Sequence, residues 1–200
     1  TNIDGTTTSN AATLTVNDCF ISGNLNYNNV ALDPLAGFIV DVNGKTATTD
    51  ALGAFTIPAV TSGTNPVTVT PPAALAPGGI NATDAGTVNK WLTAPSAIPA
   101  VKYLAGDVDM LSLDNLDASA IQQNFVSGAA FVQAPWVFYN TPVTTATIPQ
   151  PFAVTVSGAP VTGFNILGMA TGDFNGSSNP NVVGGVSNVV LTPTGLAIKV

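Results

Sequence analysis

The stretch GFIVDVNGKTATTDALGAFTIPAV (residues 37–60) decides the fold, because apolar and polar residues alternate along much of it. Asn43 and Gly44 form the pair that tolerates positive φ at both centres of a two-residue hairpin turn. Asp50 and Gly53 predict a second turn, after which Phe55 and Ile57 lie on one face, as they would in a half-buried strand. We therefore expect antiparallel β-strands here, with Asp50 as a turn residue.

The flanking segments extend this pattern in both directions. CFISGNLNY (residues 19–27) reads as a strand, with Ile21, Leu25 and Tyr27 on one face, and NPVTVT (residues 65–70) reads as the last strand of the unit. The order of these strands resembles the carboxypeptidase regulatory-like domain, a small prealbumin-like β-sandwich, over residues 19–72. The resemblance implies a spacer or packing module, since that family carries no catalytic residues.

The composition excludes several classes of function. The 200 residues contain no His, Arg or Glu, so that eleven Asp and four Lys carry all the side-chain charge. Without His, neither a Ser-His-Asp triad nor a His-based metal site can form, and without clustered Lys and Arg no nucleic-acid partner is expected. Cys19 is the single Cys, which rules out an internal disulfide and leaves core packing or an intermolecular link. No apolar run reaches 18 residues, so we expect no transmembrane segment.

Two related segments predict helices. INATDAGTVNKWL (residues 80–92) and LDNLDASAIQQNFV (residues 113–126) align with an offset of 33 residues, from Asn81 to Asp114. In each, apolar residues recur at helical spacing after an acid in the first turn, Asp84 or Asp117, where the helix dipole favours a carboxylate. The plain alternative is that these two acids only cap their helices.

The acidic segment AGDVDMLSLDNLDASAI (residues 105–121) resembles the calcium loop and helix of dockerin type I modules, which occur as duplicated pairs. Asp107, Asp109, Asp114 and Asp117 fit that pattern. The segment is one residue shorter than the pattern between Asp109 and Leu113 and lacks the middle acid and the turn glycine. The resemblance implies a second, degenerate Ca²⁺ loop; the alternative is a solvated acidic turn.

Two further segments each carry half of a calcium loop. GDFNGSSNP (residues 172–180) has the alternating oxygen ligands of a first half, and GGINATD (residues 78–84) has the turn, carbonyl and acid of a second half. Placed end to end they supply the twelve positions of a Ca²⁺ loop. The sequence therefore predicts one split calcium site, whose candidate ligands are Asp173, Asn175, Ser177, Gly79, Asn81 and Asp84.

The remaining segments favour further strands. Two segments, WVFYNTP (residues 136–142) and PFAVTVSG (residues 151–158), place Trp136, Phe138, Phe152, Val154 and Val156 in the expected core. Alternatively, Trp136 and Tyr139 could stack on sugar. We expect a mainly β fold, an Ig-like or prealbumin-like β-sandwich with a two-helix dockerin-like module and additional strands. The expected units are a trailing strand or linker of a preceding Ig-like repeat (1–18), the sandwich (19–72), the helix pair (73–128), and a β-insert with a C-terminal segment that completes the calcium loop (129–200).

This combination of segments resembles parts of large secreted bacterial surface proteins. The resemblance implies an extracellular location on the bacterial cell surface and a non-catalytic structural segment of a filament or adhesin, stabilised by Ca²⁺. Its expected partners are identical or adjoining segments of the same surface protein, with other surface proteins or glycans as further possibilities. The alternative is a dockerin-like recognition module that binds a cohesin-like partner or carbohydrate through exposed helix residues, of which Asn89, Lys90, Gln122 and Gln123 are the candidates; these do not repeat between the two helices.

Overall fold

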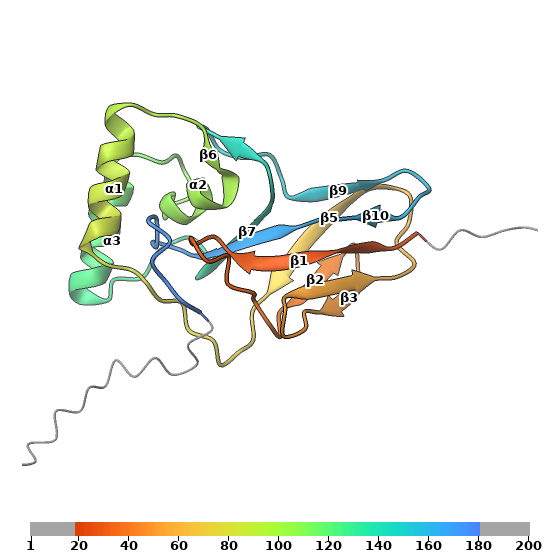
Figure 1. Cartoon of the computed structure of the whole chain (residues 1–200). Coiled ribbons are helices and arrows are strands. Elements are labelled where there is room, and N and C mark those ends of the chain that lie inside the picture. Colours follow the sequence, from red (N-terminus) through yellow and green to blue (C-terminus); the bar gives the residue numbers. More distant parts are fainter. Residues whose placement is uncertain (1–18, 181–200) are drawn as a thin grey trace, which may run out of the picture.

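The computed structural model describes residues 19–180, and the strands expected at residues 12–18 and near the C-terminus lie outside this range. Within it the chain is mainly β, with three helices gathered at one end (Figure 1). The helices are α1 Ala82–Thr93, α2 Ala100–Gly106 and α3 Asn115–Ser127. The strands are β1 Ile21–Tyr27, β2 Ile39–Val42, β3 Lys45–Thr48, β4 Ala54–Ile57, β5 Gly63–Thr70, β6 Ile98–Pro99, β7 Trp136–Asn140, β8 Thr144–Thr145, β9 Ala153–Val156, β10 Val161–Thr162 and β11 Ile166–Ala170.

Strand β1 is the centre of a five-stranded sheet. On one side it pairs antiparallel with β4, and on the other it pairs parallel with β10 near its start and with β11 near its end. β7 then pairs antiparallel with β11. The four-stranded sheet has the order β3-β2-β5-β9, and β6 and β8 form a separate small ribbon.

Strands from the expected β-insert complete both sheets. β7, β10 and β11 belong to the sheet of β1, and β9 pairs with β5. The division expected between residues 19–72 and 129–200 therefore does not describe the sheets, because strands from both segments share the same hydrogen-bond ladders. A local resemblance over residues 19–72 carries no information on such distant pairing.

One hydrophobic cluster is shared by both sheets. It includes side chains of β1, β4 and β11 from the first sheet and of β2, β5 and β9 from the second, the fully covered ones being Ile21, Leu25, Tyr27, Val40, Val42, Ile57, Ile166 and Met169. Trp136 and Tyr139 of β7 are buried in the same cluster, so neither ring presents a face to a sugar at the surface. Cys19 is half-buried against this cluster.

The expected turns are confirmed. Asn43 and Gly44 both have positive φ, 51° and 83°, between the paired strands β2 and β3. The Asp50 carboxylate accepts the backbone N–H groups of Leu52 and Ala54, and Gly53 closes this turn at φ 74°. Asp50 is therefore a turn residue.

The two expected helices are α1 and α3, which pack against each other around a second hydrophobic cluster. The candidate partner residues Asn89, Lys90, Gln122 and Gln123 are exposed on them. Helix α2 was not expected. Its residues are buried nearly all round and its N-terminus has no side-chain cap, so the sequence shows neither an amphipathic period nor a start signal. Among the residues described, no helix is long and apolar enough to cross a membrane.

Candidate metal centre

The two half loops predicted from the sequence lie together at the helical end of the molecule. The Asn175 backbone N–H donates to Oδ1 of Asp84 at 2.8 Å. The Ser177 hydroxyl donates to the Gly79 carbonyl at 3.1 Å and lies 3.3 Å from Oδ1 of Asp173. Asn81 joins the same group, since its amide nitrogen lies 3.5 Å from the Ser177 hydroxyl. All six predicted ligands therefore belong to one connected site.

Helix α1 positions the second half loop. Asn81 is the residue that caps its N-terminus, where its side chain accepts the Thr83 N–H, and Asp84 returns a bond by accepting the Asn81 N–H at 2.8 Å. This reciprocal pair is a capping box. Asp84 therefore caps α1, but capping is not its only contact, because its Oδ1 also accepts a hydrogen bond from the other half loop.

The end of β11 positions the first half loop. Gly172 and Gly176 have positive φ, 92° and 68°, and turn the chain sharply around Asp173. The Asp173 carboxylate accepts the N–H groups of Ser177 and Ser178, both at 3.0 Å, and no part of Asp173 is exposed. The loop therefore wraps around its own first acid, as a cation-binding loop does.

Gly79 fits where no larger residue would. Its φ is +87°, and a Cβ built on it would lie 2.7 Å from Oδ2 of Asp173 and 2.8 Å from Cβ of Ser178. The two half loops thus approach each other across a glycine. This close approach leaves the Gly79 carbonyl beside the Asp173 loop.

Tyr27 is a part of the site that the sequence placed only in the core. Its hydroxyl donates to Oδ2 of Asp173 at 2.5 Å and accepts the N–H of Ala170 at 3.1 Å. Burial and the neighbouring Asp173 carboxylate raise the pKa of Tyr27, so it stays a neutral donor. Tyr27 and Asp173 are 146 residues apart, and no local sequence signal could have paired them.

Burial and charge act together on the acids of this site. Burial and the nearby Asp173 carboxylate raise the pKa of Asp84, hydrogen bonds from backbone N–H groups lower it, and the net result is a pKa of about 6. The amide oxygen of Asn175 is buried and has no hydrogen-bond partner among residues 19–180. Lys102 approaches from α2, its Nζ 4.8 Å from the centre of the Phe174 ring, and burial lowers its pKa. Carboxylate, amide, carbonyl and hydroxyl oxygens together are the donor set that Ca²⁺ prefers.

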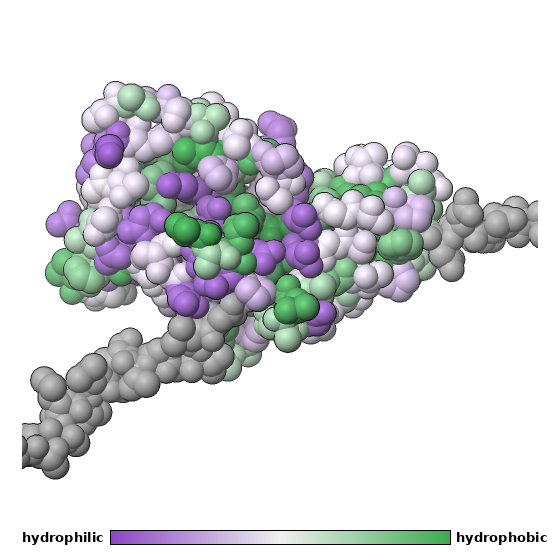
Figure 2. Space-filling view, in the orientation of Figure 1, coloured by the Kyte–Doolittle hydropathy of each residue, from purple (hydrophilic) through white to green (hydrophobic). Residues whose placement is uncertain are grey.

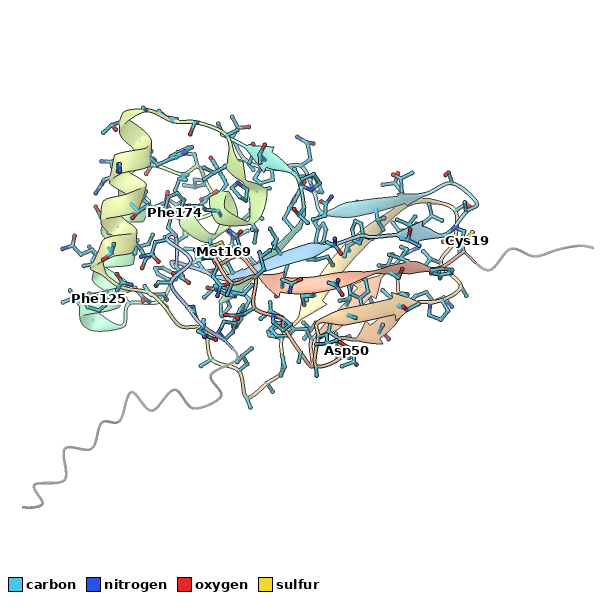
Figure 3. The ribbon with its side chains drawn as sticks, viewed as in Figure 1. Cys19, Asp50, Phe125, Met169 and Phe174 are labelled. Atoms are coloured by element: carbon cyan, nitrogen blue, oxygen red, sulfur yellow. The ribbon has the colours of Figure 1, made fainter. Side chains whose placement is uncertain are left out.

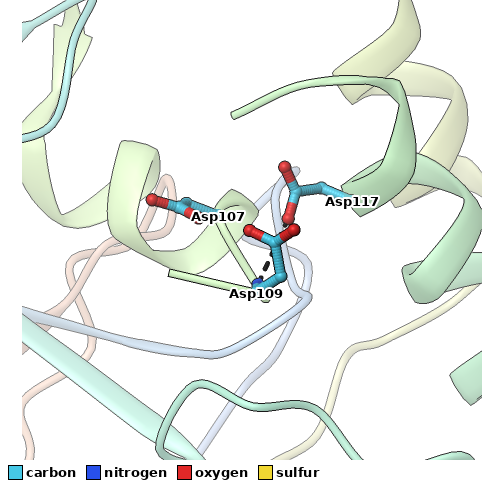
Figure 4. Close-up of side chains that lie close together, drawn as sticks. All are labelled: Asp107, Asp109 and Asp117. Atoms are coloured by element: carbon cyan, nitrogen blue, oxygen red, sulfur yellow. Dashed lines mark hydrogen bonds between the residues drawn. The ribbon is translucent and has the colours of Figure 1, made fainter. Parts of the chain in front are cut away.

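Three of the four acids predicted for the second loop also come together. Oxygens of Asp107, Asp109 and Asp117 lie within 4.8 Å of one another (Figure 4). Oδ1 of Asp117 accepts the N–H groups of Val108 at 2.8 Å and of Asp109 at 3.3 Å. Asp107 is 2% exposed, and within the described part of the chain its Oδ1 has no hydrogen-bond partner. Burial and the two neighbouring carboxylates raise the pKa of Asp107 to about 6.

The fourth predicted ligand, Asp114, has a different place. It caps the N-terminus of α3, where its side chain accepts the Leu116 N–H at 2.7 Å and its own N–H donates to Oδ2 of Asp117. It is not a member of the three-acid group. Asp114 holds on α3 the capping position that Asn81 holds on α1.

Phe174 joins the two acidic sites. It lies in the loop of the first site, is almost fully buried, and packs in the cluster between α1 and α3 (Figure 3). A Cβ built on Gly106, which directly precedes Asp107, would lie 2.7 Å from the Phe174 ring. The strongest hydrophilic colouring on the face drawn in Figure 2 lies over this helical end, whereas the opposite end of the molecule is paler.

The predicted site residues thus form two neighbouring acidic groups. The first joins residues 79–84 to residues 173–177, and the second contains Asp107, Asp109 and Asp117. Comparison with protein-family models, with curated proteins and with solved structures found no match to this chain.

Proposed function

We propose that this chain is a non-catalytic structural segment of an extracellular bacterial surface filament or adhesin, stabilised by Ca²⁺. The observation that carries the proposal is the contact between Asp84 and Asn175, which brings two half loops 91 residues apart into one site. A cation held there would join α1 to the segment after β11. Its binding free energy would become folding free energy, since neither half loop is complete alone.

The environment of the acids supports a structural role. Asp84, Asp173 and Asp117 are buried and accept hydrogen bonds from backbone N–H groups. A cavity of about 240 Å³ elsewhere on the molecule is lined by Leu35, Ala36, Phe38, Pro72, Ala74, Leu75 and Pro180, with no titratable side chain among them. The acidic groups of the two sites do not line this apolar cavity.

The two sheets around one core support the finer fold assignment, an Ig-like or prealbumin-like sandwich with a dockerin-like helix pair attached. Repeated sandwiches of this kind serve as spacers because each buries its own core. The proposed partners are identical or adjoining segments of the same surface protein. In the described sheets, β3 and β9 are each paired on one side only, and such edges can pair with another chain.

Calorimetric titration and thermal unfolding of the full chain test this proposal. Ca²⁺ should bind and raise the melting temperature, Mg²⁺ should do so much less because it demands a small octahedral shell, and excess chelator should reverse the effect. Sedimentation in both conditions then tests self-association. A melting curve that is the same in calcium and in chelator would remove the calcium-stabilised segment from consideration.

A further inference from the structure

The parallel pairing of β1 bears on how the chain would resist tension. β1 pairs with β10 at Ile21–Val161 and Ser22–Thr162, and with β11 from Leu25–Ile166 to Tyr27–Gly168. A further bond from Asn28 N–H to the Gly168 carbonyl, 3.0 Å long, continues this contact past the end of β1. The side chains of Leu25, Tyr27, Ile166 and Met169 are fully buried beneath it.

The described chain enters and leaves this pair at opposite ends. Cys19 lies at one end of the molecule, where β1 starts, and Phe174 lies beyond β11 at the helical end (Figure 3). Because both strands run in the same direction, the start of β1 and the exit from β11 are far apart (Figure 1). Tension between residues 19 and 180 would therefore pull β1 and β11 in opposite directions along their length.

The direction of loading decides how a strand pair resists tension. When two strands are pulled lengthwise past each other, all their inter-strand hydrogen bonds carry the load together and the buried side chains between them must slide at once. When both are pulled from the same end, the bonds break one after another. Resistance to forced unfolding is set by the barrier to unfolding rather than by equilibrium stability, so the first geometry gives the larger rupture force.

We propose that β1, β10 and β11 form a force-bearing clamp, reinforced at its exit by the split calcium site. The clamp itself follows from the strand pairing alone, whereas the reinforcement rests on the proposed function. Tyr27, the last residue of β1, donates its hydroxyl to Asp173, which lies three residues beyond the end of β11. A cation shared by Asp173 and Asp84 would link the segment that follows β11 to α1. Tension applied from the C-terminal side would then load the cation site before it loads the clamp.

Single-molecule force spectroscopy of the full chain tests the clamp by changing the direction of pulling. In a Cys19→Ala background, one variant carries its handles at the two chain ends. A second carries one handle at the N-terminus and the other on a cysteine introduced by Ala159→Cys, in the exposed turn before β10. The first loads β1 against β11 lengthwise, and the second peels β10 from the start of β1. The clamp requires a rupture force several-fold higher in the first geometry, in calcium and in chelator alike; equal forces would overturn it.

Measurements with and without calcium separate the clamp from its reinforcement by the split calcium site. Calcium should raise the force of the earliest event in the end-to-end geometry and leave the peeling force unchanged. Asp84→Asn should abolish that increase while preserving the difference between the two geometries. A geometry difference without any calcium effect would retain the clamp and reject the reinforcement. A calcium effect equal in both geometries would reject the reinforcement at the exit of the clamp and leave calcium as a general stabiliser.

Discussion

The backbone N–H of Asn175 donates to Oδ1 of Asp84, and Oδ2 of the same carboxylate accepts the N–H of Asn81. The Asp84 carboxylate thus completes the capping box of helix α1 and also contacts the other half loop, which lies 91 residues further along the chain. Any change at Asp84 therefore acts on both the helix and the split site.

Asp173→Asn and Asp84→Asn should have strongly non-additive effects in calcium, because each removes a ligand of the same cation. After the first substitution little calcium stabilisation remains to be lost, so the double variant should fall short of the summed losses by about 0.5–3 kcal/mol. Chemical denaturation in calcium and in chelator measures this. Asp50→Asn paired with Asp84→Asn is the control, and its effects should add, since Asp50 serves a separate turn. Additive losses for Asp173 and Asp84 would place them in different sites.

Gly79→Ala should destabilise the chain and weaken calcium binding. The new Cβ would lie 2.7 Å from Oδ2 of Asp173, and φ of +87° strains any L residue. Gly86→Ala is the matched control, because it lies in α1 with nothing within 4 Å of the added Cβ. There alanine should stabilise the helix by up to about 1 kcal/mol. A Gly79→Ala variant that unfolds at the temperature of the unchanged chain would refute the close approach of the half loops.

The effect of calcium should depend on pH. Burial raises the pKa of Asp84 and of Asp107 to about 6, whereas an Asp in the unfolded chain has a pKa of about 3.9. In chelator these groups therefore contribute stability that is fully present below about pH 4 and is lost as pH rises through about 6. Calcium requires the ionised carboxylates and should reverse this loss. We expect a large calcium-induced rise in melting temperature near pH 7.5 and a small one near pH 4.5.

A calcium effect of the same size at both pH values would contradict this assignment. Asp84→Asn should reduce the calcium effect near neutral pH and leave the part of the pH dependence that belongs to Asp107. Melting curves across this pH range in calcium and in chelator separate the two groups.

Tyr27→Phe should cost about 1–3 kcal/mol, because the Ala170 N–H loses its partner and Oδ2 of Asp173 loses a donor in a fully buried place. Tyr139→Phe is the comparison, since its hydroxyl makes one part-buried bond to the Gln150 carbonyl, and it should cost less. Calcium affinity should fall for the first variant only. Denaturant titration and calorimetry measure both quantities, and equal affinity in the two variants would remove Tyr27 from the site.

Local features of the fold were predictable because the residues that cause them are neighbours. Asn43-Gly44 sets its turn through its own φ values, and the spacing after Asp84 and Asp117 predicts α1 and α3. Helix α2 was not predictable, since burial on almost every side removes the polar stripe that reveals a helix. The parallel pairing of β1 with β11 depends on register between distant strands, which a local pattern does not encode.

The candidate site was partly predictable for a similar reason. Calcium loops have a fixed order of ligand types, so two incomplete loops are visible as halves of one pattern. Tyr27 and Lys102 have no place in that order and reach the site only through the packing of β1 and α2. Asp114 illustrates the reverse case, because its spacing fits the pattern while its side chain caps α3 and lies outside the three-acid group.

The separation of the half loops also orders events during synthesis of the chain. Asp84 leaves the ribosome 91 residues before Asn175, an interval of about 5–20 s at the ~5–20 residues per second of translation. Throughout that interval the acid can begin α1 but has no opposing loop. A nascent chain that stops before residue 173 would carry every residue of α1, α2 and α3 and still lack the Asp173–Ser177 half of the proposed site. The split site can thus form only after residues 173–177 have been synthesised.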